Sequence, residues 1–90
     1  MPEYDLVFVD ANKKAYRAYY DLLLTENWVR RSGMIVFDNI LYSGFVYDER
    51  TRDRPIPKAL NSFTRHVMTV NKRAFILPAY DGLLMAPVVN

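Results

Sequence analysis

Hydrophobic residues along the chain form two short continuous runs, and each run stops at a carboxylate. The first run covers residues 5–10 and ends at Asp10, and the second covers residues 34–39 and ends at Asp38 and Asn39. Runs of this length, rich in Val, Ile and Phe, predict strands that are buried on both faces of a sheet. One helix fits between them, so the spacing predicts a βαβ unit whose two strands are parallel.

The segment between the two runs shows the period of an amphipathic helix. The polar residues 12–14 can start this helix. Residues 30–33 close it, with basic side chains near the helix end and Gly33 in a left-handed turn into the next strand. The apolar face consists of Tyr16, Tyr19, Tyr20, Leu23, Leu24 and Trp28. Such a stripe is typical of a helix that packs on a sheet.

Two loops and a second helix are predicted after Asn39. Residues 40–47 are apolar but contain a Ser-Gly pair, which indicates a loop or short turn. Residues 48–54 are charged and predict a mobile surface loop, followed by Pro55 and Pro57, which stop regular structure. The helix then starts at residue 57 or 58, with proline near its first turn, and ends near Thr69.

The last part of the chain predicts an antiparallel strand pair. Residues 74–78 and 83–89 form the two strands, and Asp81-Gly82 is a strong turn signal between them. Residues 1–90 are therefore expected to form a single α/β domain. Its sheet has about four strands, two parallel and then an antiparallel pair, and it carries two main helices.

Composition narrows the classes of function. The chain has 90 residues, of which 51% are hydrophobic, so one small domain can build its own core. The absence of Cys excludes disulfides, thiolate metal sites and a Cys nucleophile, and it fits a reducing, cytoplasmic compartment. The net charge of +2 is small and the basic residues are scattered, which argues against nucleic-acid binding. No stretch has the length of a membrane span, and no signal-peptide pattern is present.

The candidate chemistry lies at the two strand ends. Asp10, Asp38 and Asn39 emerge at the carboxyl ends of neighbouring parallel strands, where open α/β sheets bind ligands. Three hard oxygen ligands suit Mg²⁺ or another divalent cation such as Ca²⁺ or Mn²⁺. Alternatively, such acids cap the next helix or stay solvated. His66 has no His, Cys or acidic neighbour in sequence and is expected to be a helix-surface or half-buried residue rather than a ligand.

Three blocks, residues 4–16, 33–46 and 77–83, resemble the C-terminal half of the cation-dependent O-methyltransferases in order and spacing. This family contains the caffeoyl-CoA and catechol O-methyltransferases. The resemblance covers essentially the whole chain and implies half of a Rossmann-like methyltransferase sheet. It also implies that Asp10, Asp38 and Asn39 hold the divalent cation, and that Asp10 lies beside the cofactor S-adenosylmethionine.

The resemblance further implies a reaction. The cation chelates two vicinal hydroxyls of a small phenolic or catechol-like acceptor and lowers the pKa of one of them. Lys13 takes the proton as general base, and the phenolate attacks the methyl group of S-adenosylmethionine. Asn12, Tyr42 and Ser43 stand at candidate substrate positions where members of the family often have Asp, Trp and Asn.

The first half of the family, with the Gly-rich loop and the acid that bind the cofactor, has no counterpart in this sequence. The chain has only three Gly residues and no G-x-G. We therefore expect a fragment, a split-gene product or a truncated gene model that is inactive alone. The alternative is a noncatalytic fragment that associates through an exposed sheet edge, with a second copy or with a complementary N-terminal half. A phospho-acceptor receiver domain ranks lower, because an acidic pair near the N-terminus and a late strand-end Lys are missing.

Overall fold

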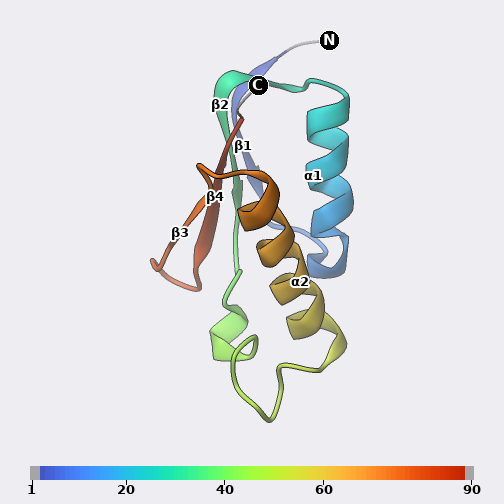
Figure 1. The fold of residues 1–90 in the computed structure, drawn as a ribbon, viewed down its shortest axis with the longest axis vertical. Coiled ribbons are helices and arrows are strands. Elements are labelled where there is room, and N and C mark those ends of the chain that lie inside the picture. The colour runs from blue at the N-terminus through green and yellow to red at the C-terminus, as the bar shows by residue number, and fades with distance from the viewer. Residues whose placement is uncertain (1–2, 89–90) are drawn as a thin grey trace.

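A computed structural model describes residues 3–88 as a four-stranded sheet with two helices (Figure 1). Strands β1 and β2 are parallel, and β4 lies antiparallel between β2 and β3. This confirms the predicted sheet of two parallel strands followed by an antiparallel pair. In chain order the elements are β1 (Tyr4–Val9), the 3-10 turn η1 (Lys13–Ala15), α1 (Tyr16–Thr25), β2 (Val29–Phe37), the 3-10 turn η2 (Tyr42–Gly44), α2 (Pro55–Val70), β3 (Phe75–Leu77) and β4 (Leu83–Pro87).

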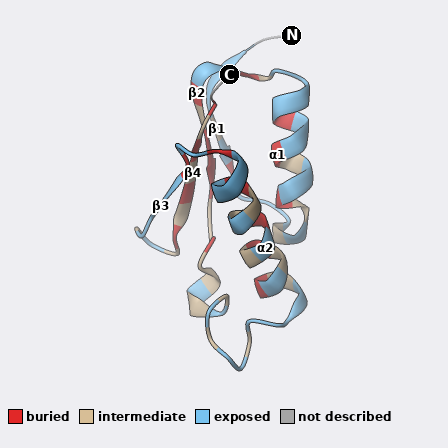
Figure 2. Cartoon of the chain, viewed as in Figure 1, coloured by how far each residue is buried: buried red, intermediate tan, exposed pale blue. Residues whose placement is uncertain are grey.

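Both helices lie on the same side of the sheet and enclose one hydrophobic core (Figures 1 and 2). Aromatic rings form its centre, where Phe37 of β2 meets Phe63 of α2 with ring centroids 4.7 Å apart. Tyr16 of α1 packs 5.2 Å from Phe37. The other buried core residues include Val9, Tyr20, Leu23, Ile35, Leu60, Val67, Leu84 and Ala86. Tyr16, Tyr20 and Leu23 of the predicted apolar stripe are thus core, whereas Leu24 is exposed.

The opposite face of the sheet is not covered by any element of residues 3–88, so the prediction of burial on both faces is wrong for β1. Leu6 is 60% exposed and Phe8 is 56% exposed. They alternate with the core-facing Val7 and Val9, because successive side chains of a strand point to opposite faces. Phe75 and Leu77 of β3 are also exposed. Because both helices return to one face, Leu6 and Phe8 of β1 remain open to solvent, as do all three residues of β3.

The first helix ends at Thr25, so the prediction that it reaches Trp28 is wrong. Asn27 takes the left-handed conformation, with φ 55°. The Trp28 N–H donates to the Leu23 carbonyl and the Asn27 N–H to the Leu24 carbonyl, both at 3.2 Å. These are the two hydrogen bonds of a Schellman motif, which ends helices at a Gly or Asn. The stop signal was therefore Asn27.

Residues 30–33 were predicted to close the helix, but they belong to β2, which already begins at Val29. Gly33 does not take a left-handed conformation. Instead, a Cβ atom at this position would lie 2.8 Å from the Asp5 carbonyl oxygen and 2.9 Å from the Arg30 carbonyl oxygen. Gly33 is thus required because a carbonyl of β1 and a carbonyl of β2 itself both lie too close for a side chain. The Arg30 guanidinium pairs with the Asp5 carboxylate at 2.8 Å rather than with a helix end.

The second helix begins at Pro55, two residues earlier than predicted, and continues to Val70. Pro55 and Pro57 start this helix instead of preventing it, because the N–H groups of a first helical turn have no intrahelical partner to lose. The two final strands are shorter than predicted, and Val89 lies outside the described residues. Neither helix within residues 3–88 combines the length and the apolar character that a membrane crossing requires.

Candidate metal and acceptor site

The ends of β1 and β2 are held side by side, which fixes where their acidic residues start. The Asp38 N–H donates to the Val9 carbonyl at 3.0 Å and so extends the pairing of the two strands. The buried Tyr16 hydroxyl donates to the Asp38 carbonyl at 2.8 Å and lies 3.4 Å from the Val9 carbonyl. Tyr16 is therefore a clamp between the two strand ends, and Asp10 and Asn39 follow directly after them.

Asp10 and Lys13 form an ion pair at this edge. The Lys13 Nζ lies 2.7 Å from Asp10 Oδ1 and 5.2 Å from the centre of the Tyr16 ring. The Lys13 side chain is 15% exposed and that of Asp10 is 53% exposed. Burial by itself would lower the pKa of Lys13, but the hydrogen bonds with Asp10 and Tyr16 outweigh it and raise that pKa above its ordinary value. Lys13 is therefore an ammonium donor at neutral pH.

Asn39 is fixed in an unusual backbone conformation. Its φ of 61° lies in the left-handed region, which Asn tolerates better than most residues. The Asn39 N–H donates to Asp38 Oδ1 at 2.7 Å, and its side-chain Nδ2 donates to Asp81 Oδ2 at 3.1 Å. Donation by Nδ2 sets the orientation of the amide. The Oδ1 atom of Asn39 is then the end that can accept from a ligand.

Asp81 is the site residue that sequence reasoning missed, because Asp81-Gly82 was interpreted only as a turn. Its carboxylate also accepts a short hydrogen bond from the Ser43 N–H. Two backbone hydrogen bonds, from Ile40 to Gly82 at 3.1 Å and from Leu41 to Asp81 at 2.9 Å, join the same two loops. A signal was available. That turn precedes β4, and pairing of β4 antiparallel to β2 brings the start of β4 to the edge where β2 ends, beside Asp38 and Asn39.

The candidate substrate residues are placed differently. Asn12 Oδ1 accepts from the Lys14 N–H at 3.1 Å and so caps η1. Tyr42 stacks edge-on against Phe45, with ring centroids 5.7 Å apart, and Ser43 is exposed in the same short turn. Tyr42 and Ser43 therefore stand next to the Asn39–Asp81 pair, whereas the side chain of Asn12 caps the backbone of η1.

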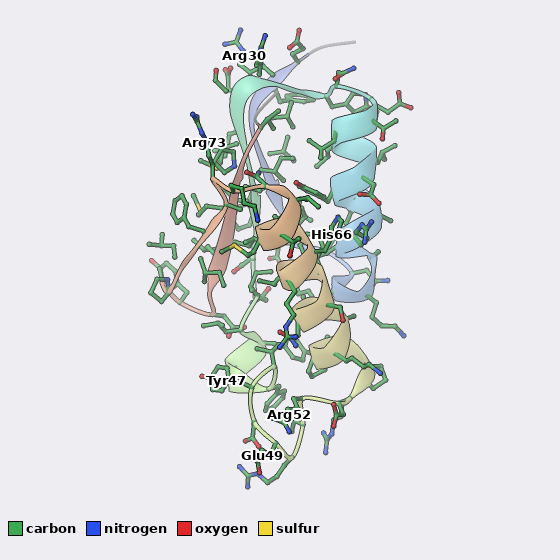
Figure 3. All side chains as sticks on the ribbon, viewed as in Figure 1. Arg30, Tyr47, Glu49, Arg52, His66 and Arg73 are labelled. Carbon is green, nitrogen blue, oxygen red and sulfur yellow. The ribbon has the colours of Figure 1, made fainter. Side chains whose placement is uncertain are left out.

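His66 does not belong to this edge. Figure 3 shows it on α2, on the side of the α1 helix. It is partly buried, and its ring lies edge-on to Tyr20 with centroids 6.4 Å apart. This agrees with the expectation of a half-buried residue.

The chemical types of the candidate ligand atoms fit a hard divalent cation. Asp10, Asp38 and Asn39 offer carboxylate and amide oxygens, which Mg²⁺ and Ca²⁺ prefer. Within residues 3–88, no three His, Cys, Asp or Glu side chains gather as a metal-binding group. A cation here would therefore depend on the Asn39 amide oxygen and on oxygens from water or the acceptor to complete its shell.

Residues 1–87 match the family described as O-methyltransferase. The chain belongs to the O-methyltransferase family. This assignment sets aside the phospho-acceptor alternative. Among curated relatives, the chain is 34% identical over 89 residues to "Probable caffeoyl-CoA O-methyltransferase 1" of Dictyostelium discoideum, with 97% of this chain and 37% of the relative covered. It is 38% identical over 71 residues to the caffeoyl-CoA O-methyltransferase of Populus kitakamiensis, covering 79% of this chain and 28% of the relative.

Solved structures give the same family fold. The SAH-bound methyltransferase PaMTH1 of Podospora anserina matches with a TM-score of 0.82 and 26% identity, over 100% of this chain and 43% of that one. The O-methyltransferase TomG of Streptomyces achromogenes, in complex with SAM, matches with a TM-score of 0.75 and 25% identity, over 100% and 42%. This O-methyltransferase chain thus spans about two fifths of the length of the proteins it matches.

Proposed function

We propose that this chain is the metal- and acceptor-binding half of an O-methyltransferase that depends on S-adenosylmethionine and a divalent cation. Its acceptor is a hydroxyl of a small catechol-like or phenolic compound. The observation that carries this proposal is the hydrogen bond from Asn39 Nδ2 to Asp81, which orients an amide oxygen at the edge where Asp10 and Asp38 also emerge.

Each strand-end residue has a separate part in this proposal. Asp38 and Asn39 hold the cation, and Asp10 contributes a carboxylate to it from the neighbouring strand. A bound divalent cation would lower the pKa of the acceptor hydroxyl. Tyr42 and Ser43, beside Asn39, line the acceptor. These residues position a hydroxyl oxygen and favour its deprotonated form.

Lys13 is the proposed general base. Its ammonium group is 2.7 Å from Asp10, within reach of the same edge. As the ammonium donor described above, Lys13 must first release its proton before it can take one from the acceptor. In the state described here it therefore positions Asp10.

The cofactor side of the reaction involves few residues of this chain. S-adenosylmethionine would supply the methyl group, and Asp10 is the one candidate contact proposed for it here. The related structures of PaMTH1 and TomG were solved with SAH and SAM, and they extend well beyond the matched part. The share of this chain is thus to hold and activate the acceptor.

Replacement of Asp38 tests the proposal directly. Titration of Mn²⁺ into the purified chain, followed by electron paramagnetic resonance, should show one bound ion, and Asp38→Ala should remove it. Asp53→Ala, which changes an exposed acid in the surface loop, should bind Mn²⁺ like the wild type. In a chimera that carries this chain in place of the matching segment of the Dictyostelium discoideum relative, Asp38→Ala should abolish Mg²⁺-dependent methyl transfer to a catechol. Undiminished turnover would refute the metal role.

A noncatalytic association module is the second candidate function. The observation that favours it is the position of β1 at the edge of the sheet, with exposed apolar side chains. The two candidate functions predict different effects of substitutions at the strand-end residues. A pure association module would tolerate Asp38→Ala and Asn39→Ala without any change in cation binding.

A further inference from the structure

A cavity of about 270 Å³ lies at the end of the sheet opposite to the candidate metal site. Its lining includes Val29, where β2 begins, and Pro87, where β4 ends. Asp38 follows the other end of β2, and the turn that holds Asp81 precedes β4. Both helices end toward the cavity (Figure 1) and line it with residues of their last turns. The cavity is therefore separate from the residues proposed for the metal and the acceptor.

The inner wall of this cavity is apolar. Ile35 and Ala86 are 0% and 1% exposed, and Val88 is buried as well. Leu24 and Val70 also line the cavity but are exposed, so they mark its side toward solvent. In an engineered protein, an apolar cavity of about 150 Å³ takes up benzene. The larger cavity here therefore has room for an aromatic ring with a substituent.

Tyr20 contributes a hydroxyl donor to the cavity. Its side chain lines the cavity and is only 4% exposed. Burial raises the pKa of Tyr20, and Asn71 opposes this as a hydrogen-bond donor to the phenolate. The Asn71 amide is otherwise engaged, because Oδ1 accepts from the Arg73 N–H at 3.0 Å and Nδ2 donates to the Pro87 carbonyl at 2.8 Å. Among residues 3–88, the O–H of Tyr20 is thus left without an acceptor, which is costly for a buried donor.

We infer that this cavity is a binding site for a small, uncharged aromatic molecule with one hydrogen-bond acceptor, such as a carbonyl oxygen. The ring covers Ile35 and Ala86, and the acceptor takes the O–H of Tyr20. No charged side chain of residues 3–88 lines the cavity, and a charge buried without a partner is strongly disfavoured, so the ligand is neutral. This molecule is distinct from the methyl acceptor, because the candidate metal ligands lie at the other end of the sheet. The inference therefore does not depend on the proposed function.

Water alone fits the cavity less well. A buried water needs two to four polar partners, and it could find them only near Tyr20 and Asn71. Water along the inner wall would face Ile35, Ala86 and Val88, which offer no hydrogen bonds from their side chains. An aromatic ring with one acceptor satisfies the apolar wall and the Tyr20 hydroxyl together.

Methyl resonances of isoleucine test this inference in the purified 90-residue chain. Ile35 lines the cavity, whereas Ile40 and Ile76 do not, so the two serve as internal references. We expect acetophenone, which carries a carbonyl, to shift the Ile35 methyl resonance saturably and to leave that of Ile76 in place. Ethylbenzene, which has a similar size and no acceptor, should bind the same cavity. Tyr20→Phe should weaken acetophenone about fivefold, the usual effect of one hydrogen bond, and leave ethylbenzene unchanged.

A substitution at the open side of the cavity provides the second test. Leu24→Trp places a large ring at this side and should remove the binding of both ligands. Leu22→Trp, at another exposed leucine of α1 that does not line the cavity, is the matched control and should bind like the wild type. Circular dichroism of each variant checks that the fold is preserved.

The outcomes are independent of the Mn²⁺ titration, because no candidate metal or acceptor residue lines the cavity. A saturable Ile35 shift that Leu24→Trp removes, with the Tyr20→Phe loss confined to acetophenone, supports the site. Absence of a saturable shift, or equal shifts of Ile35 and Ile76, would overturn it. Saturable binding of acetophenone that Tyr20→Phe leaves unchanged would overturn the assignment of a ligand with a hydrogen-bond acceptor.

Discussion

The side-chain amide of Asn39 donates a hydrogen bond to the Asp81 carboxylate at 3.1 Å, although the two residues are 42 positions apart in the chain. This bond ties the end of β2 to the turn before β4. It makes Asp81 the residue that orients a proposed ligand without being one itself. Replacing a residue that orients a metal ligand in this way typically weakens metal binding.

Asp81→Ala should therefore weaken the binding of Mn²⁺ by about 10- to 100-fold, the usual effect of removing a partner of a metal ligand. The reason is that the Asn39 amide and the Ser43 N–H both lose their acceptor. Titration followed by electron paramagnetic resonance measures the change. Asp81→Asn, which keeps an acceptor oxygen, should lose less. Equal affinity in the alanine variant would show that Asn39 needs no orientation or is not a ligand.

Tyr16→Phe should lower the free energy of unfolding by about 1–2 kcal/mol, because the Asp38 carbonyl loses its buried hydrogen-bond donor. The ring itself remains, so the aromatic core is preserved. Urea denaturation followed by circular dichroism gives the value. Tyr80→Phe removes a hydroxyl from an almost fully exposed side chain and should change little. Equal stability of the Tyr16 variant would mean that the two strand ends need no clamp.

The raised pKa of Tyr16 predicts how the free energy of unfolding changes at alkaline pH. Burial raises the pKa of Tyr16, although the hydrogen bond with Lys13 opposes this. An unfolded tyrosine titrates near about pH 10. The folded state thus holds the proton more tightly, and this stabilisation is complete below about pH 10 and lost as the pH rises through the folded-state value. In Tyr16→Phe, unfolding free energy should fall less steeply above that pH than in the wild type. A parallel decline in both proteins would contradict the assignment.

Gly33→Ala should destabilise the fold by about 1–3 kcal/mol, the cost of overpacking a tight contact. The added Cβ would meet two carbonyl oxygens, those of Asp5 and Arg30, within 2.9 Å. Thermal unfolding measures the loss. Ser32→Ala, at the exposed neighbouring residue, is the matched control and should be near neutral. A neutral Gly33 variant would show that β1 and the first residues of β2 can both move away from the added Cβ.

The sheet was predictable because its signals are local. Continuous apolar runs marked β1 and β2, and the Asp81-Gly82 pair marked the turn between β3 and β4. The end of the first helix was missed because Asn27 resembles any polar surface residue until its left-handed conformation and the bonds of Trp28 are seen. Sequence period alone let Trp28 continue the apolar stripe.

The exposed face of β1 could not be predicted from its own residues. Leu6 and Phe8 resemble core residues, and only the return of both helices to one side of the sheet leaves them open. Similarly, the importance of Asp81 depends on the order of strands in space, which places its turn beside Asn39. The types of the candidate ligands are a local property of sequence, whereas their orientation depends on contacts between distant segments.

The isolated chain should bind S-adenosylmethionine weakly or not at all. In nucleotide-binding sheets, affinity comes from a Gly-rich turn that approaches the ligand and from an acid on the ribose hydroxyls. Here Gly33 lies inside β2, and Gly44 and Gly82 lie in turns that follow or precede β strands without opening a long helix. None of them forms such a turn.

Asp10 is then the main candidate contact in this chain, and its carboxylate is already paired with Lys13 and half exposed. One charged contact near water contributes about 1 kcal/mol or less, whereas micromolar binding requires about 8 kcal/mol. Calorimetric titration of the purified 90-residue chain with S-adenosylmethionine should show no micromolar site, with TomG as the positive control because its structure contains SAM. The chimera with the Dictyostelium discoideum relative should bind it. One micromolar site per molecule on the chain alone would refute the proposal that this chain mainly holds the metal and the acceptor. The cofactor would then have a binding surface within these 90 residues.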